Sequence, residues 1–430
     1  MGDAVSDTRI ANVRAWQAFD SRGRPTVGCR VELASGAHGS VVVPSGASTG
    51  THEGHELRDR AAQFNGMGVL AAVANAEGEL ARAVSGLDAR DQHMVDAALR
   101  SADGTENLSV LGANAVLAIS LGSAIASADH ARRPLYETLV GAEDPLLPLP
   151  MVNIVSGGAH AGWSVDVQDV LVVPVGATSF EQAIEWSWGV RFAAEAIFTR
   201  SGWNAALVAD EGGLSGNPSS NREMLHVVVD AIEQAGLVPG RDVAIAIDVA
   251  ATQLLTDDGS YHLRAEGRTL TAGELVTEID GWAQEFPLVS IEDPLGEDDW
   301  VTWSEATRRL AGRQIVGDDL FATSESRLAT GVARGAANAI LVKPNQNGTV
   351  SGAHDVLVAA RSERYATVVS ARSGDTEDAW LADLAVGWRA GQIKVGSLTR
   401  SERTGKWNRL LEIERCHAGC EFAGAAALGS

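Results

Sequence analysis

The chain has 430 residues, which leaves room for a barrel of about 250 residues and one further domain. Its 34 lysines and arginines are outnumbered by 56 acidic residues, and the net charge of −22 opposes binding to nucleic acid or to an anionic membrane. No segment approaches about 18 uninterrupted apolar residues, and the N-terminus lacks the basic and apolar regions of a signal peptide. We therefore expect a soluble, cytoplasmic protein.

The first third of the chain is predicted to contain strands followed by helices. Residues from about 8 to 60 contain short strand-like runs separated by turns with Gly and Pro, and residues from about 68 to 140 are predicted to be helical. The run 107–133 is rich in small and apolar residues and suggests a buried helix pair. Strands followed by helices indicate an α+β domain. The segment EDPLLPLPM breaks regular structure, so we divide the chain into 1–147 and 148–430.

Six apolar runs in the second half end in ionisable or hydroxyl-bearing clusters. These clusters are Asp248, Glu292–Asp293, Asp318–Asp319, Lys343, Arg372–Ser373 and Lys394. After a first gap of 44 residues, positions 292, 318, 343, 372 and 394 follow at steps of 26, 25, 29 and 22. Each step is close to the length of one strand plus one returning helix, so the spacing predicts a barrel of parallel β-strands wrapped by helices, an α/β fold.

The carboxyl ends of parallel barrel strands face a common mouth, so these charged residues are predicted to converge. Carboxylates as crowded as Asp248, Glu292 and Asp318 would repel one another unless a cation lies between them, and their hard oxygen atoms suit Mg²⁺. A single Asp after a strand could instead cap the next helix, but five successive strand ends argue against capping for the whole set.

The residues alone leave the role of two segments undecided. The segment VPSGASTGTHE is either a plain surface loop or a mobile lid whose hydroxyl groups close over a ligand. Cys416, His417 and Cys420 lie close together near the end of the chain. They lack a fourth metal ligand, so we expect a frayed tail there instead of a metal site.

Eleven segments of the chain resemble, in order, the landmark segments of the enolase family. They are FDSRGRPTV, VPSGASTGTHEGHELRD, LGANAVLAISL, PMVNIVSGGAHA, VADEGG, AIDVAA, SIEDPL, VGDDLFAT, LVKPNQNGT, SARSGDTEDAWLADLAVG and GQIKVGSLTRSER. The resemblance extends from about residue 10 to 415. It implies an N-terminal α+β domain capping an eight-stranded, TIM-like α/β barrel, a homodimer, a small phosphorylated acid as substrate, and two Mg²⁺ ions per active site.

The resemblance also implies a role for each site residue. Asp248, Glu292 and Asp318 match the ligands of the tightly bound Mg²⁺, and Ser48 matches the ligand of a second Mg²⁺ that binds with the substrate. The implied substrate-binding residues are His160, Gln168, Asp169, Arg372, Ser373 and Lys394, with Arg372 and Ser373 at the phosphate and Lys394 at the carboxylate.

Lys343 and Glu211 are the implied catalytic pair, because they match the general base and the acid that helps hydroxide to leave. A base must be neutral to accept a proton. We expect the neighbouring Lys394 and the metal ions to lower the pKa of Lys343 toward the working pH.

The chain departs from the family pattern at three places. Ala371 replaces a histidine, Asp169 is one methylene shorter than the usual glutamate, and Gly162–Trp163 replaces a small polar residue. By resemblance, the first two lie beside Glu211, on the side where hydroxide leaves. The changes therefore concern elimination, whereas the residues expected to abstract the proton and bind phosphate are unchanged.

Three functions are compatible with these residues. The first is phosphopyruvate hydratase activity, the Mg²⁺-dependent and reversible conversion of 2-phosphoglycerate to phosphoenolpyruvate. The second is an enolase-like enzyme of phosphonate or phosphinate natural-product biosynthesis, of the carboxyphosphonoenolpyruvate synthase type, in which a roomier site accepts a phosphonoformyl donor. The third is a non-catalytic binding protein that retains the fold. The near-complete set of motifs favours the first.

Overall fold

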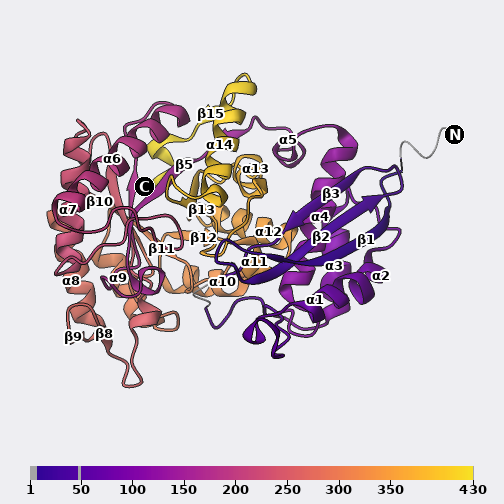
Figure 1. Ribbon diagram of the computed structural model, residues 1–430, viewed down its shortest axis with the longest axis horizontal. Coiled ribbons are helices and arrows are strands. Elements are labelled where there is room, and N and C mark those ends of the chain that lie inside the picture. Colours follow the sequence, from indigo (N-terminus) through magenta and orange to yellow (C-terminus); the bar gives the residue numbers. More distant parts are fainter. Residues whose placement is uncertain (1–6, 47–49, 430) are drawn as a thin grey trace.

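The computed structural model describes residues 7–46 and 50–429, which form an N-terminal domain beside a larger barrel (Figure 1). The N-terminal sheet is antiparallel, in the order β1 (Ile10–Phe19), β2 (Pro25–Leu33) and β3 (His38–Val42). Helix α4 (Ala113–Ala131) packs on β2 and β3. A side chain at Gly39 or Gly122 would clash across this contact, so the two glycines allow the close approach of helix and sheet.

The helix pair expected within 107–133 is one helix. The chain is in the left-handed region at Leu108 (φ 57°) and Gly112 (φ 98°), which ends any helix before α4 begins. The other helices of this domain are η2 (Gln63–Gly66), α1 (Leu70–Asn75), η3 (Ala76–Leu80), α2 (Ala81–Val84), α3 (Gln92–Asp103) and α5 (Leu135–Leu139).

The barrel is closed and eight-stranded, as expected, with the strand order β10-β11-β12-β13-β14-β5-β6-β7. Its strands are β5 (Leu149–Ser156), β6 (Asp169–Val173), β7 (Ala244–Asp248), β10 (Leu288–Glu292), β11 (Gln314–Gly317), β12 (Ala339–Val342), β13 (Ala366–Ser370) and β14 (Gln392–Gly396). The expectation of parallel strands is wrong for β6, which is antiparallel to both neighbours. Residues 157–168, with only the short η4 (Gly158–Ala161), are too few for a parallel crossover.

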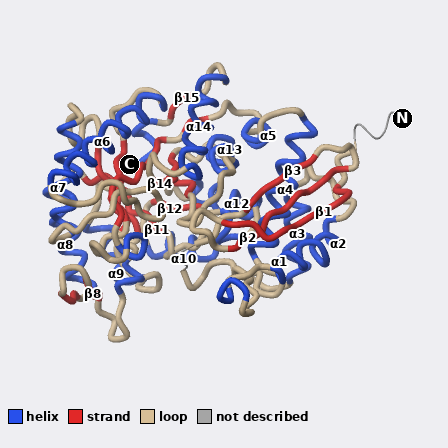
Figure 2. The backbone as a smooth tube through the Cα atoms, in the orientation of Figure 1, coloured by secondary structure: helices blue, strands red, loops and turns tan. Residues whose placement is uncertain are grey.

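Helices surround the barrel strands (Figure 2). They are α6 (Phe180–Arg200), α7 (Asn221–Gln234), η5 (Ala251–Leu254), α8 (Ala272–Glu285), α9 (Trp300–Arg309), α10 (Glu325–Arg334), α11 (Pro344–Asn347), α12 (Val350–Ser362), α13 (Trp380–Gly387) and α14 (Ser401–Cys416). The gap of 44 residues also holds the hairpin of β8 (Tyr261–Leu263) and β9 (Arg268–Leu270). None of the helices in the described part of the chain is both long and apolar enough to cross a lipid bilayer.

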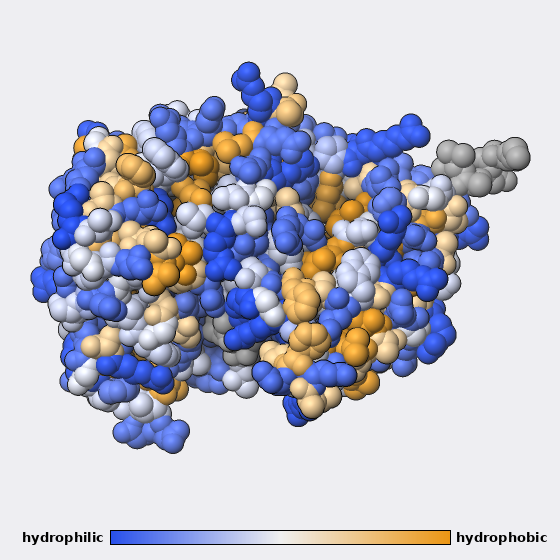
Figure 3. Space-filling view, viewed as in Figure 1, coloured by the Kyte–Doolittle hydropathy of each residue, from blue (hydrophilic) through white to orange (hydrophobic). Residues whose placement is uncertain are grey.

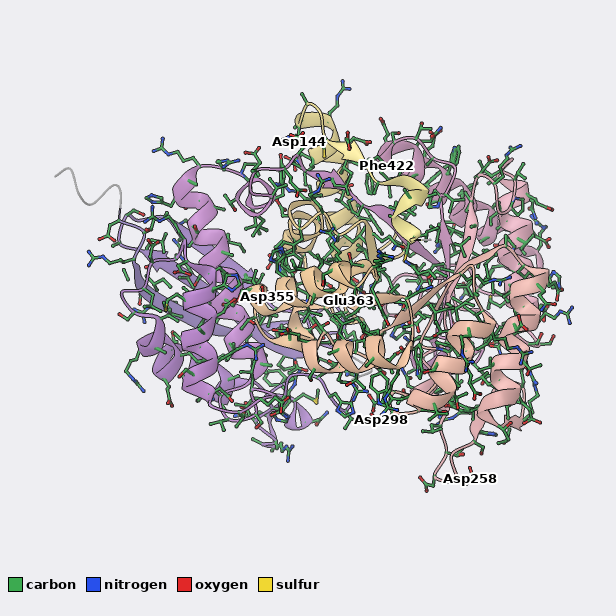
Figure 4. All side chains as sticks on the ribbon, turned by 180° about the vertical axis from the view of Figure 1, so that it is seen from behind. Asp144, Asp258, Asp298, Asp355, Glu363 and Phe422 are labelled. Carbon is green, nitrogen blue, oxygen red and sulfur yellow. The ribbon has the colours of Figure 1, made fainter. Side chains whose placement is uncertain are left out.

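The expected frayed tail is wrong. Strand β15 (Glu421–Phe422) pairs with β4 (Leu146–Leu147), and the short helix η6 (Gly424–Leu428) follows. Phe422, in β15, and Asp144, two residues before β4, are labelled in Figure 4. Ala427 and Leu428 pack against the inner barrel residues that include Leu149, the first residue of β5. The tail therefore covers the end of the barrel opposite to the charged strand ends.

Candidate active site

The charged strand ends converge on one small polar cavity of about 20 Å³. It is lined by His160, Gln168, Glu211, Asp248, Lys343, Ser370, Ala371, Arg372, Ser373 and Lys394. Eight of the twelve residues implied by the resemblance are among them. The other described ones, Asp169, Glu292 and Asp318, contact members of this set, and Ser48 lies outside the described residues.

Two lysines pair with the three carboxylates expected to bind metal. The Lys394 Nζ lies 2.8 Å from Asp248 Oδ2 and 2.8 Å from each carboxylate oxygen of Glu292, and the Lys343 Nζ lies 2.5 Å from Asp318 Oδ2. All five side chains are buried. Gln168 adds a hydrogen bond from its Nε2 to Asp248 Oδ2, at 3.1 Å. The structure thus places these side chains together at the carboxyl ends of the barrel strands.

The acids here are more crowded than the lysines can neutralise. Burial, and next the charge of Asp248, raise the pKa of Glu292 well above its usual range despite the contact with Lys394. Burial and neighbouring carboxylates likewise raise the pKa values of Asp293 and Asp319. A cation bound by these oxygen atoms would relieve this repulsion, and an all-oxygen set of ligands suits Mg²⁺. The side chains present therefore fit a divalent metal site.

The grouping of potential ligands differs from the predicted trio. Among the described residues, Asp318 has ligand atoms within 4.8 Å of those of Asp293 and Asp319, and Asp248 and Glu292 belong to no such group. Asp293, in the left-handed region at φ 40°, accepts hydrogen bonds from the backbone of both Asp318 and Asp319. Its carboxylate thus holds the turn after β11 that presents Asp318 to the cavity.

The lowered pKa expected for Lys343 is wrong for this arrangement. Burial opposes its charge, but the nearby carboxylates, first that of Asp318 and then that of Glu292, together outweigh burial and the neighbouring cations, so the pKa of Lys343 is raised. Sequence spacing brought the two residues into one cavity but could not show that they are in direct contact. A divalent cation bound by Asp318 would compete with the ammonium group for the same carboxylate oxygen atoms.

The distribution of lysine supports a chemical role for this amine. The chain contains only three lysines, Lys343, Lys394 and Lys406, and their exposed fractions are 9 %, 5 % and 1 %. The remaining 31 of the 34 basic side chains are arginines. Unlike the guanidinium of arginine, an amine can lose its proton when its surroundings disfavour the charge. Two of the three lysines line the cavity.

The predicted phosphate pair, Arg372 and Ser373, is buried and linked to the N-terminal domain. The Arg372 Nη1 lies 2.8 Å from Glu53 Oε2, and its Nη2 lies 3.3 Å from Oε1. Arg22, in the turn between β1 and β2, donates to Ser373 Oγ at 3.5 Å and to the carbonyl oxygen of Ser45 at 2.9 Å. Sequence reasoning missed both Glu53 and Arg22, although each lies inside a segment that matches the family.

A second cluster at the cavity joins Asp169 to His160. One carboxylate oxygen of Asp169 accepts hydrogen bonds from Asn153 and Ser156, and the other lies 3.3 Å from His160 Nδ1. Burial acts against the charged imidazole, but the nearby carboxylates, first that of Asp169, together outweigh burial and raise the pKa of His160. Ligand atoms of His160, Asp169 and Glu211 lie within 4.8 Å of one another.

The two other positions at which the chain differs, by resemblance, from the family pattern are Ala371 and Gly162–Trp163. Ala371 presents a methyl group to the cavity that His160 and Glu211 also line. Trp163 has a left-handed backbone (φ 65°), and the guanidinium of Arg264 lies 4.2 Å from the centre of its ring. This cation–π contact anchors the loop between β5 and β6 to the loop between β8 and β9.

Comparison with family models agrees with this architecture. The model described as the enolase N-terminal domain matches residues 10–139, and the model described as the enolase C-terminal TIM barrel domain matches residues 144–428. The chain belongs to the enolase family. The resemblance stated from the sequence is thereby confirmed, and so is the α/β fold. Membership makes the protein a lyase of the enolase superfamily. Enolase-family domains generally use a divalent metal, and the acidic clusters described above are compatible with one.

Proposed function

We propose that this protein is a phosphopyruvate hydratase, which reversibly dehydrates 2-phosphoglycerate to phosphoenolpyruvate through an enolate intermediate. The observation that carries the proposal is one cavity lined by two buried lysines, a buried arginine and the buried Asp248, with the buried Glu292 and Asp318 paired to the two lysines. Abstraction of a proton next to a carboxylate requires a base and concentrated positive charge, and this set provides both.

Each side chain has a defined task in the proposal. Arg372 and Ser373 bind the phosphate, because a guanidinium fork and a hydroxyl group both donate to phosphate oxygens. Lys394 binds the substrate carboxylate, on which negative charge develops. Lys343 accepts the α-proton at Nζ, and Glu211 protonates the departing hydroxide. His160, Gln168 and Asp169 form the wall beside Glu211.

Asp248, Glu292 and Asp318 would hold one Mg²⁺ ion, and Ser48 would contribute to a second that binds with the substrate. When bound, the ions supply positive charge that stabilises the developing dianion. A cytoplasmic location and a homodimer complete the proposal. The dimer is supported by Trp188 and Phe192 on α6, which stack at 5.4 Å although 59 % and 60 % exposed, since such apolar surface is typical of an interface.

A second candidate is the phosphonate-type enzyme named above. Ala371 in place of an imidazole removes volume beside Glu211, and the Asp169 carboxylate is turned to Asn153, Ser156 and His160. Both features favour a larger group on the leaving-group side. The phosphate side is complete in either case, so the two candidates differ only in the second half of the reaction.

The test measures proton abstraction and product formation separately. Purified protein with Mg²⁺ and 2-phosphoglycerate should produce phosphoenolpyruvate, followed by its ultraviolet absorbance, and Lys343→Ala should abolish the product while the fold is retained by circular dichroism. Exchange of the α-proton with deuterium, followed by NMR, reports proton abstraction alone. Exchange without product would reject the hydratase and favour the second candidate. If neither is seen, the chain is not acting on this substrate.

A further inference from the structure

The carboxylate of Glu53 contacts the guanidinium group of Arg372, which binds the substrate phosphate in the proposed function. Its two oxygen atoms lie 2.8 Å and 3.3 Å from Nη1 and Nη2 of Arg372, a fork-to-fork contact. The side chains of Arg372 and Glu53 are only 3 % and 6 % exposed. The pair is therefore a desolvated contact, and not a surface ion pair that water would screen.

Glu53 is held by more than this arginine. Its Oε1 also accepts a hydrogen bond from the backbone N–H of Gly50 at 3.0 Å and from the Nε2 of Gln346 at 3.3 Å. The Gln346 Nε2 also lies 3.0 Å from Oδ1 of Asp318. Displacement of Glu53 from the guanidinium would therefore also break its contacts with Gly50 and Gln346.

From this arrangement we propose that Glu53 is an internal competitor for the anion site. Its carboxylate must leave Arg372 before an anionic group of the substrate can bind, so binding is an exchange of one anion for another. The proposal rests on the assignment of Arg372 to phosphate under the proposed function. The displacement of Glu53 lowers the affinity of the site for every anion by the same factor.

Other contacts hold the same segment without involving Arg372. Thr51 donates from its Oγ1 to Glu297 Oε1 at 2.6 Å, and the His52 Nε2 lies 3.0 Å from Asp298 Oδ1. Asp298 is exposed and lies away from the cavity (labelled in Figure 4). Loss of the Asp298 contact loosens the segment but leaves Glu53 on the guanidinium. Asp298→Asn is thus the matched control for Glu53→Gln.

The experiment measures the binding of two probes by calorimetry or NMR titration to wild-type protein, Glu53→Gln, Asp298→Asn and Arg372→Met. Methyl phosphate is a dianion at about pH 8, and methyl sulfate is a monoanion of nearly the same shape. Glu53→Gln keeps the size and hydrogen-bond acceptor of the side chain but removes its charge. We expect it to bind both probes about tenfold more tightly than wild type. Asp298→Asn should bind both like wild type.

Each outcome has one meaning. Equal increases in affinity for the two probes support the exchange of anions, because the displacement of Glu53 then costs the same free energy for both. A higher affinity for methyl phosphate alone would overturn the exchange, because it would indicate electrostatic repulsion by Glu53 at a distance. Unchanged or weaker binding of both probes would overturn the exchange as well. If Arg372→Met binds methyl phosphate as well as wild type does, the phosphate assignment in the proposed function fails instead.

A second measurement on unmodified protein serves if Glu53→Gln does not fold. Glu53 accepts the hydrogen bond from the Gly50 amide, so its displacement should expose that amide. Addition of methyl phosphate should therefore speed hydrogen exchange at Gly50. Unchanged or slower exchange would contradict the displacement of Glu53.

Discussion

Replacement of Lys394 by methionine would test whether the barrel mouth needs positive charge. The ammonium group of Lys394 contacts three carboxylate oxygens at 2.8 Å, and its removal leaves Asp248 and Glu292 facing each other in a buried site. Loss of one partner from a buried, hydrogen-bonded ion pair costs about 3–5 kcal/mol. For 430 residues the entropy of unfolding is about 0.9 kcal/mol/K, so we expect Tm to fall by roughly 3–6 °C in buffer without divalent ions.

Mg²⁺ should reverse much of this loss. A ligand that binds only the folded protein raises Tm, and in Lys394→Met the ion replaces the missing charge without displacing an ammonium group. The rise in Tm on addition of Mg²⁺, measured by differential scanning fluorimetry at a fixed scan rate, should therefore be larger for Lys394→Met than for wild type. Product formation should be lost, because the substrate carboxylate no longer meets Lys394.

Arg191→Met is the matched control. Arg191 is also a buried cation (3 % exposed) and pairs with Glu195 on α6, outside the cavity. Its variant should lose stability without any larger response to Mg²⁺. If Lys394→Met and Arg191→Met respond equally to Mg²⁺, or if Lys394→Met unfolds at the wild-type temperature, the assignment of the acidic cluster to a divalent metal is refuted.

Three further predictions concern the scaffold. Burial opposes the charge of Asp375, but its contact with Lys406 lowers its pKa. The folded protein therefore binds fewer protons at Asp375 than the unfolded chain does. The ion pair stabilises the fold fully above about pH 4, and this stabilisation is lost as the pH falls further. The Tm difference between wild type and Asp375→Asn should accordingly shrink below that pH, and a constant difference would contradict the ion pair. Burial raises the pKa of Cys29 to about 12, so iodoacetamide at about pH 8 should label the exposed Cys416 but leave Cys29 unmodified until the protein unfolds, as read by peptide mass spectrometry. Deletion of residues 423–430 uncovers the apolar end of the barrel and should lower Tm by several degrees, whereas a tail without a structural role would leave it unchanged.

The barrel could be predicted from sequence because each repeat is encoded locally. A strand and its returning helix need about 25 residues whatever lies elsewhere, so charged residues at that spacing identify the strand ends. Strands β7 and β10 end at Asp248 and Glu292, as expected. The spacing does not show whether a strand is parallel or antiparallel to its neighbours, however. The antiparallel direction of β6 follows from the short segment 157–168 that precedes it.

Pairings between side chains could not be predicted in the same way. Glu53 and Arg372 are separated by 319 residues and meet only because the N-terminal domain packs on the barrel mouth. The raised pKa of Lys343 likewise depends on its direct contact with Asp318, which sequence spacing does not show. A family pattern assigns residues to a site, whereas their protonation is set by distances of a few ångströms.

By resemblance, the chain differs from the family pattern at Ala371 and Asp169. Ala371 lines the same cavity as His160, and Asp169 contacts His160 while its other carboxylate oxygen accepts hydrogen bonds from Asn153 and Ser156. In the proposed function, these positions concern the departure of the leaving group, whereas Lys343, Lys394 and Arg372 form the enolate and bind the phosphate. Under that proposal, a change in leaving group leaves the formation of the enolate unchanged. The ratio of α-proton exchange to product formation would measure how far that separation has gone.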